Sequence, residues 1–146
     1  MRDMAGHQMK PILRAAREDD TPFLKWLEEV CMRDYAMALW GAWRPAPEET
    51  LAFQNHRIIL DEGRDVGCVS TIRSADHMWV DRLYVAPSHQ RRGLGGGALR
   101  MVIAEAAASH LPVRLSVLTT NPAIAFYRRE GLRVYQETPE RFFMTT

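Results

Sequence analysis

Two arginines and a cluster of glycines form the stretch of this sequence best suited to bind a charged ligand. Arg91 and Arg92 precede glycines at positions 93, 95, 96 and 97, and the cluster lies between an apolar segment and a helical pattern. The first N–H groups of a helix have no intrahelical partner and carry positive partial charge. A glycine-rich helix start presents these donors openly, and neighbouring guanidinium groups add the charge that a pyrophosphate requires. The stretch therefore predicts a site for a phosphorylated cofactor.

Two other interpretations of the glycine cluster are a dinucleotide-binding loop and a flexible turn. The residues from Gly93 to Ala98 also fit the dinucleotide fingerprint G-x-G-x-x-A. That fingerprint begins a βαβ unit and is followed about 20 positions later by an acidic residue. Here only 53 residues follow Gly93, and the next apolar run, 113–118, contains no carboxylate. A flexible turn without a ligand is the third interpretation, but glycines are a costly way to begin a helix unless something binds there.

Composition and charge exclude several classes of function. The chain has 146 residues, of which 47% are hydrophobic and 25% charged, with a net charge of +1. So balanced a charge does not favour binding to nucleic acid or to a membrane surface, and no apolar run reaches the roughly 20 residues of a membrane helix. The two cysteines, Cys31 and Cys68, form no metal-ligand pattern. We expect no metal site, two reduced thiols and a cytoplasmic location.

Hydrophobic periodicity predicts the elements that position the glycine stretch. Residues 1–9 have no apolar core typical of a signal peptide, so we expect an irregular lead-in followed by one domain over residues 10–146. In chain order, the pattern predicts a strand at 11–16, a helix from Asp20 or Thr21, a short helix at 48–56, strands at 57–60, 66–72 and 78–85, a helix ending near 109–110, a strand at 113–118, a helix at 121–130, and a hairpin of 132–136 with 141–144. Gly67 is expected at a bulge or a close approach. This order predicts an α/β fold with a twisted mixed sheet and helices on both faces.

Two segments of the sequence resemble a known family. The residues from Gln90 to Gly95 fit the pattern Q/R-x-x-G-x-G/A behind the strand Leu83-Tyr84-Val85, and 121–132 looks like the N…A…Y…GF segment of the same family. In this order, they make the chain similar to the GCN5-related N-acetyltransferases from about Pro11 to Met144. The resemblance implies a single N-acetyltransferase domain that transfers an acetyl group from acetyl-coenzyme A to a primary amine and releases coenzyme A.

The resemblance also implies which residues hold the cofactor. Backbone N–H groups between Arg91 and Gly96 would hold the pyrophosphate, and the strand end at 83–85 would pair with the pantetheine arm where the sheet splays apart. Asn121 would contact the cofactor near that arm, and the hydroxyl of Tyr127 would lie beside the sulfur. The implied cofactor-binding residues are Leu83, Tyr84, Val85, Gln90, Arg91, Arg92, Gly93, Leu94, Gly95, Gly96, Asn121 and Tyr127.

Acetyl transfer to an amine requires a base, a proton donor and a donor to the oxyanion. Tyr127 fits the proton donor for the departing thiolate, although on spacing alone it could be a packed aromatic. Asp81 is the nearest carboxylate for the base and shares one face with Leu83 and Val85 if the strand is unbulged. It could equally pair with Arg82 or Arg114. The resemblance places the oxyanion donor at a backbone N–H near Val85. Many family members carry a glutamate near the position of Asp81, whereas this chain has Trp79 two positions earlier.

The acceptor is a small-molecule or peptide amine of unassigned identity. Trp40, Trp43 and Phe53 lie in the region that forms one wall of the acceptor site in this family, although aromatic core packing is the default for them. An aromatic wall favours an apolar or cationic acceptor, whereas the nearby Arg44 favours a carboxylate. His56 and His77 are expected at the surface or at strand ends. A non-catalytic acyl-coenzyme A binding module, a hydroxyl acceptor, a longer acyl chain and a homodimer also fit the sequence.

Overall fold

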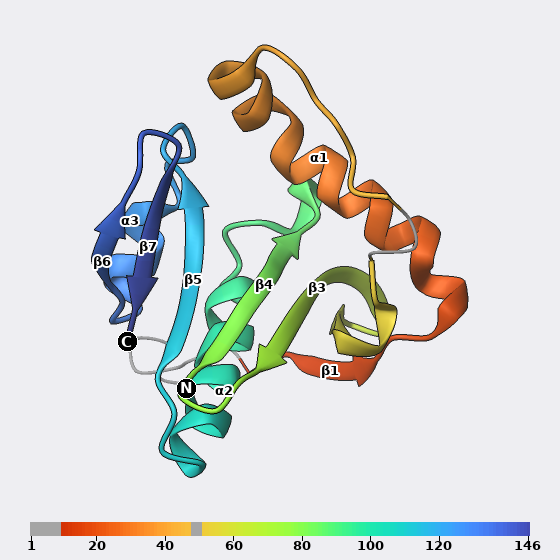
Figure 1. Ribbon diagram of the computed structural model, residues 1–146. Helices are drawn as coiled ribbons and strands as arrows, with labels where there is room; N and C mark the ends of the chain where they lie inside the picture. The colour runs from red at the N-terminus through yellow and green to blue at the C-terminus, as the bar shows by residue number, and fades with distance from the viewer. Residues whose placement is uncertain (1–9, 48–50) are drawn as a thin grey trace.

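Short apolar runs separated by turn residues fold into seven strands of one sheet (Figure 1). The computed structural model describes residues 10–47 and 51–146. Its main elements are β1 (Ile12–Ala15), α1 (Thr21–Trp40), β2 (His56–Asp61), β3 (Arg64–Arg73), β4 (Met78–Val85), α2 (Leu94–Ala108), β5 (Val113–Leu118), α3 (Ile124–Arg129), β6 (Arg133–Glu137) and β7 (Arg141–Thr145). In the described part of the chain, short 3₁₀ turns lie at Glu18–Asp20, Phe53–Asn55 and Pro87–His89.

The sheet divides into two antiparallel parts that meet at a parallel pair of strands. The strand order is β1-β2-β3-β4-β5-β7-β6, and only β4 and β5 run parallel. These two strands pair at their first residues alone, Met78 with Val113 and Trp79 with Arg114. Beyond this point they diverge, and α1 lies across the far end of β4 (Figure 1). The predicted α/β fold with a splayed mixed sheet is confirmed.

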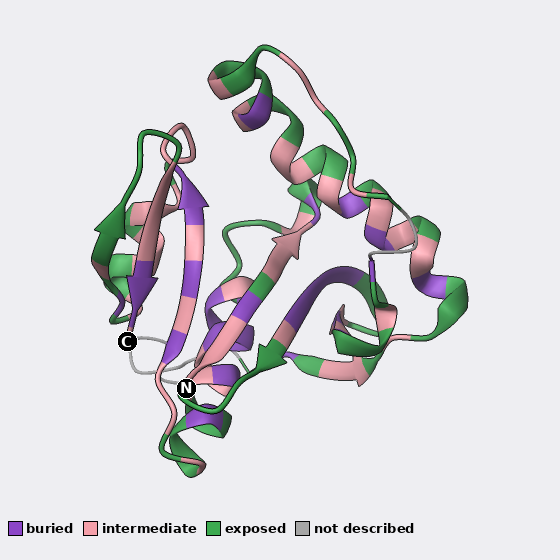
Figure 2. Ribbon diagram, in the orientation of Figure 1, coloured by how far each residue is buried: buried purple, intermediate pink, exposed green. Residues whose placement is uncertain are grey.

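Each face of the sheet is covered by different helices, because side chains alternate along a strand. Cys68 packs with Leu24 and Leu27 of α1 on one face. The next residue, Val69, packs with Leu99 of α2 on the other face, where α3 also contributes. Figure 2 shows the resulting pattern of buried residues on the central strands, with β6 largely exposed at the edge. Helices on both faces were predicted, and this arrangement confirms them.

Two predicted helices differ from the structure. Residues 48–50 lie outside the described part of the chain, and Phe53–Asn55 form a single 3₁₀ turn where a helix was predicted over 48–56. Ala52 has a φ of 48°, which is incompatible with an α-helix, and His56 already pairs with Ser70 in the sheet. The helix predicted at 121–130 is shorter and spans Ile124–Arg129.

Gly67 marks a close approach between β3 and β4, as predicted. A Cβ atom at this position would lie 2.4 Å from the carbonyl oxygen of Tyr84 and 3.2 Å from the Cα of Val85. The backbone of β4 therefore leaves no room for a side chain at this position, beside the part of β4 that enters the candidate site.

Candidate functional site

Beyond Trp79, the end of β4 presents toward β5 a backbone edge that no described strand pairs with, hereafter the free edge. The N–H of Ala86 donates to the carbonyl of Val66 on β3 at 2.7 Å. Backbone groups of successive residues in a strand point to opposite edges. The N–H and C=O groups of Leu83 and Val85 therefore point away from β3, to the side where β5 has diverged. A ligand with amide groups can pair with this edge as an additional strand would.

Two side chains fix the carbonyl at the tip of β4. The amide nitrogen of Gln90 donates to the carbonyl of Val85 at 2.8 Å, and the thiol of Cys31 on α1 contacts the same oxygen at 3.4 Å. Burial raises the pKa of the Cys31 thiol to about 11, so the sulfur keeps its proton and donates it. Gln90 thus acts in this structure by tying the glycine loop to β4, and α1 is anchored to the same point.

The loop before α2 has the backbone shape of an anion-binding turn. Arg91 and Gly93 both adopt left-handed conformations, with φ of 65° and 81°, and Leu94 begins the helix. The first backbone bond of the helix runs from the N–H of Gly97 to the carbonyl of Gly93 at 2.9 Å, so the preceding N–H groups lack intrahelical partners. Such successive donors form a concave site for a phosphate.

The two arginines of this loop differ in their surroundings. Both are exposed, and Arg92 forms an ion pair with Asp61 of β2 at 3.1 Å. Gly95 lies beside Val85, since a Cβ there would be 3.7 Å from a methyl group of that valine. The glycine loop and the free edge of β4 are therefore adjacent.

Tyr127 lies on α3 and packs against the same core as α2. Burial raises the pKa of its phenol to about 12, so the hydroxyl is protonated at neutral pH. The pKa of the Tyr84 phenol on β4 is raised mainly by burial, then by Glu28, and Tyr127 makes a smaller contribution in the same direction. A neutral phenol capable of donating a proton therefore packs against the core on the α2 side of the sheet. Asn121 precedes α3, where its side-chain oxygen accepts the N–H of Ala123 at 2.9 Å.

The condition under which Asp81 would share a face with Leu83 and Val85, an unbulged strand, is not met in β4. Ser70 pairs with Arg82 and Thr71 pairs with Val80, which leaves Asp81 as the extra residue of a β-bulge. The bulge reverses the alternation, so Val80 and Leu83 both face the α2 side of the sheet. Asp81 therefore does not share the face of Leu83 and Val85.

The bulge leaves Asp81 accessible on the α1 side of the sheet. Its side chain is 41% exposed and contacts the guanidinium of Arg82 at 3.2 Å. The same guanidinium contacts Glu28 of α1 at 3.3 Å. Without the bulge, Asp81 would point into the core below α2, so the irregularity turns a buried position into an accessible carboxylate.

A row of buried polar residues crosses three strands below α1, and sequence reasoning did not identify it. His56 on β2, Ser70 on β3 and Arg82 on β4 are register partners and share one face. The Nδ1 of His56 lies 3.0 Å from the carbonyl of Ala52, so it carries the proton, and Nε2 is left as a buried acceptor. Neither Nε2 nor the Ser70 hydroxyl has a hydrogen-bond partner among residues 10–47 and 51–146. Burial lowers the pKa of His56.

His56 was expected at the surface or at a strand end, and it begins β2 with only 3% of its surface exposed. His77 lies in the turn before β4, where it contacts Asp76 at 2.7 Å, beside the end at which β4 and β5 still pair. His77 is therefore remote from the open part of the sheet.

The second half of α1 spans the opening between β4 and β5. Cys31 contacts the end of β4, as described above, and one turn later the carbonyl of Tyr35 accepts a hydrogen bond from the Thr120 hydroxyl at 2.8 Å. Thr120 follows the end of β5. The helix therefore connects the separated ends of the two strands.

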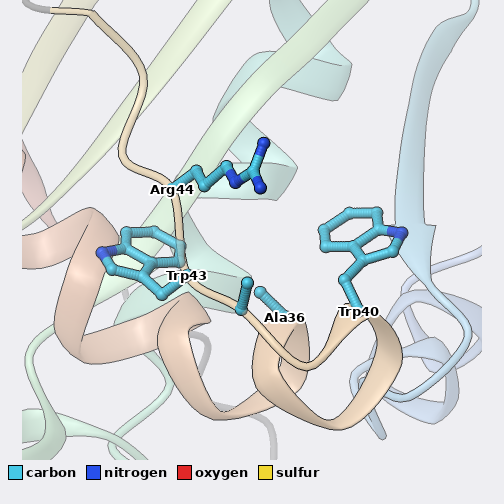
Figure 3. Close-up of a pocket in the computed structure, with 5 residues that line it drawn as sticks. Ala36, Trp40, Trp43 and Arg44 are labelled. Atoms are coloured by element: carbon cyan, nitrogen blue, oxygen red, sulfur yellow. The ribbon is translucent and has the colours of Figure 1, made fainter.

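A pocket of about 440 Å³ lies on this same half of α1. Its described lining consists of Ala36, Trp40, Ala42, Trp43 and Arg44. Figure 3 shows the side chain of Arg44 extending between the two indole rings, above Ala36. The indole N–H of Trp40 donates to Glu140 in the β6–β7 turn at 2.9 Å. Phe53, by contrast, packs against the core cluster below α1, so core packing is its role.

Within the described part of the chain, no group of three His, Cys, Asp or Glu residues could hold a metal ion. No helix there is long and apolar enough to cross a membrane.

Comparisons with known proteins agree with this geometry. Residues 53–133 match the family model described as an acetyltransferase (GNAT) domain. Among solved structures, the PaiA N-acetyltransferase from Thermoplasma acidophilum, in complex with coenzyme A, matches with a TM-score of 0.75 at 15% identity, over 94% of this chain and 99% of that chain. The ribosomal-protein-S18-alanine N-acetyltransferase from Escherichia coli matches with a TM-score of 0.71 at 20% identity, over 92% of each chain. Arabidopsis thaliana Naa50, in complex with the bisubstrate analogue CoA-Ac-MVNAL, matches with a TM-score of 0.70 at 17% identity, over 94% of this chain and 99% of that chain.

Proposed function

Because the chain belongs to the GNAT acetyltransferase family, we propose that it transfers an acetyl group from acetyl-coenzyme A to a primary amine by direct attack in a ternary complex. The observation that carries the proposal is the free backbone edge of Leu83 and Val85, next to a helix start with open N–H donors. An amide-containing arm that ends in a pyrophosphate needs this pair of features side by side.

Each part of the cofactor has matching residues in this proposal. The backbone from Arg91 to Gly96 would hold the pyrophosphate, with Arg91 and Arg92 supplying positive charge. The edge at Leu83 and Val85 would pair with the amides of the pantetheine arm. Asn121 would approach the arm through its side-chain nitrogen, since its oxygen already accepts the N–H of Ala123.

The residues around the edge can support the chemistry of transfer. Acetyl-coenzyme A supplies an activated thioester, and attack by the amine nitrogen forms the new C–N bond as the C–S bond breaks. A backbone N–H of Leu83 or Val85 would stabilise the negative charge that develops on the carbonyl oxygen. The phenol of Tyr127 would protonate the departing sulfur, because its raised pKa keeps it neutral at the pH of the reaction.

For the proton released by the amine, we propose Asp81 as the base. Its carboxylate is accessible on the side of the sheet that α1 covers, and Arg82 holds it in place. The pocket on α1 lies on that side too, so an amine bound there would approach the thioester and Asp81 from the same direction.

A thermal-shift titration with acetyl-coenzyme A, coenzyme A and NAD in parallel tests the cofactor. A ligand at 100 times its dissociation constant stabilises the native state by about 2.7 kcal/mol. We expect acetyl-coenzyme A and coenzyme A to raise the melting temperature and Arg92→Glu to reduce that shift. A shift with NAD alone would contradict the proposal. Thiol release in the presence of an amine panel then tests transfer itself.

A further inference from the structure

The pocket on α1 carries a positive charge that no residue in the described ranges 10–47 and 51–146 neutralises. Arg44 is exposed and has no ion-pair partner in the part of the chain that the structure describes. Arg141 of β7 lies against the ring of Trp40 with its guanidinium carbon 5.9 Å from the ring centre. Its guanidinium donates a hydrogen bond to the neutral Ser116 hydroxyl at 3.4 Å. Two guanidinium groups thus flank the same indole.

A carboxylate that contacts this indole is already engaged. Glu140 accepts the N–H of Trp40 at 2.9 Å, so it faces the edge of the ring and does not pair with Arg44. The remaining lining consists of two indole rings and two alanines. Among the described residues, the pocket therefore combines flat apolar walls with a cation that has no ion-pair partner. This combination is complementary to an anion on an apolar body and not to a second cation.

The pocket is positioned to present its ligand to the proposed reaction. Its lining begins at Ala36, one residue after Tyr35, whose carbonyl is bonded to Thr120 beyond the end of β5. One turn earlier, Cys31 contacts Val85 on the free edge of β4. A ligand held by this part of α1 therefore lies over the gap between β4 and β5.

We propose that this pocket selects acceptors that carry a carboxylate and an apolar or aromatic group together with the amine, and that Arg44 recognises the carboxylate. This inference rests on the proposed acetyl transfer and adds to it the chemical class of the acceptor. A guanidinium matches a carboxylate with two parallel N–H donors, so the recognition is directional as well as electrostatic. The indoles of Trp40 and Trp43 accommodate the apolar group.

Binding is measured first without turnover, so that the test does not depend on catalysis. Protein saturated with coenzyme A is titrated with 3-phenylpropanoate and with the neutral 3-phenylpropanamide, and quenching of tryptophan fluorescence is followed. We expect the acid to bind at least about tenfold more tightly, the effect of one charge-assisted hydrogen bond pair at an accessible site. Arg44→Gln should remove this preference and leave binding of the amide unchanged. Arg73→Gln, at the exposed far end of β3, is the matched control and should behave as the wild type.

Turnover is then compared for phenylalanine, phenylalaninamide and phenethylamine by release of the coenzyme A thiol. We expect kcat/KM to be highest for phenylalanine and Arg44→Gln to raise its KM while leaving the KM for acetyl-coenzyme A unchanged. Equal binding of acid and amide, no binding of the acid, or an equal loss of both in Arg44→Gln would overturn the inference. Selective binding of the acid without acetylation of any amine would instead contradict the proposed function.

Discussion

Substitution of Gly67 by alanine tests whether the contact between β3 and β4 sets the position of the free edge of β4, where we propose that the cofactor binds. The new Cβ would lie 2.4 Å from the carbonyl oxygen of Tyr84 and 3.2 Å from the Cα of Val85. Both are backbone atoms, so no side-chain rotation can relieve the clash, and β4 must shift. Overpacking of this kind costs about 1–3 kcal/mol, and the rigid neighbours favour the upper part of that range.

A loss of about 3 kcal/mol should lower the melting temperature by roughly 6–12 °C in a chain of this size. Urea unfolding measures the free energy, and a titration of the folded variant with coenzyme A measures its affinity. Because Leu83 and Val85 would move with β4, we expect that affinity to fall as well. Gly95→Ala is the contrasting variant, since its Cβ would make an ordinary 3.7 Å contact and alanine favours the helix by about 0.5–1 kcal/mol. A Gly67→Ala protein as stable as the wild type, with unchanged affinity, would refute this account of β4.

Three further predictions follow from individual side chains. Tyr127→Phe should lower kcat strongly while leaving the dissociation constant of coenzyme A unchanged, as measured by thiol release and thermal shift; an unchanged kcat would exclude the phenol as proton donor. Burial is the main cause that lowers the pKa of His56; the charge of Arg82 lowers it further, whereas Asp81 and Glu28 raise it. Because the folded state therefore resists protonation of this ring, the stability should fall as the pH drops below about 6.5. His56→Gln should flatten that part of the stability profile in urea unfolding, and a profile identical to the wild type would contradict the assignment. Arg14 bonds Asp20 through two 2.9 Å contacts and holds the pKa of that carboxyl at about 2, below its usual 3.8. Arg14→Ala should therefore destabilise the protein at neutral pH, and the difference from the wild type should shrink as the pH falls toward 2; a difference independent of pH would count against this ion pair.

The parts of the site that could be predicted are those that depend on residues close together in the sequence. The glycine loop ahead of α2 was identified because left-handed backbone and open helix donors require glycine within a few positions. Gly67 was identified for a similar reason, since a glycine inside a strand marks close approach. The family resemblance, confirmed by the match over residues 53–133, rests on the same local segments.

Features that depend on two strands at once could not be predicted in this way. The bulge at Asp81 arises from the pairing of β4 with Ser70 and Thr71, and an alternating pattern in one strand contains no sign of it. The buried row of His56, Ser70 and Arg82 has the same origin, because only the register brings these three residues together. The predicted helix over 48–56 failed where His56 joined the sheet, which is a case of tertiary pairing prevailing over local propensity.

The second half of α1 links the two ends of the proposed reaction. Cys31 contacts the carbonyl of Val85 at the cofactor edge, and Trp40, nine positions further along, lines the pocket and binds Glu140. A rigid helix that contacts both places fixes the distance between acceptor and thioester without a separate domain. In this proposal, the specificity for the acceptor depends on α1 and the loop to Arg44, which lie outside the matched residues 53–133. For this reason, the family motifs indicate the cofactor but do not identify the acceptor. For the same reason, variants at Arg44 should change the choice of amine and leave binding of the cofactor intact.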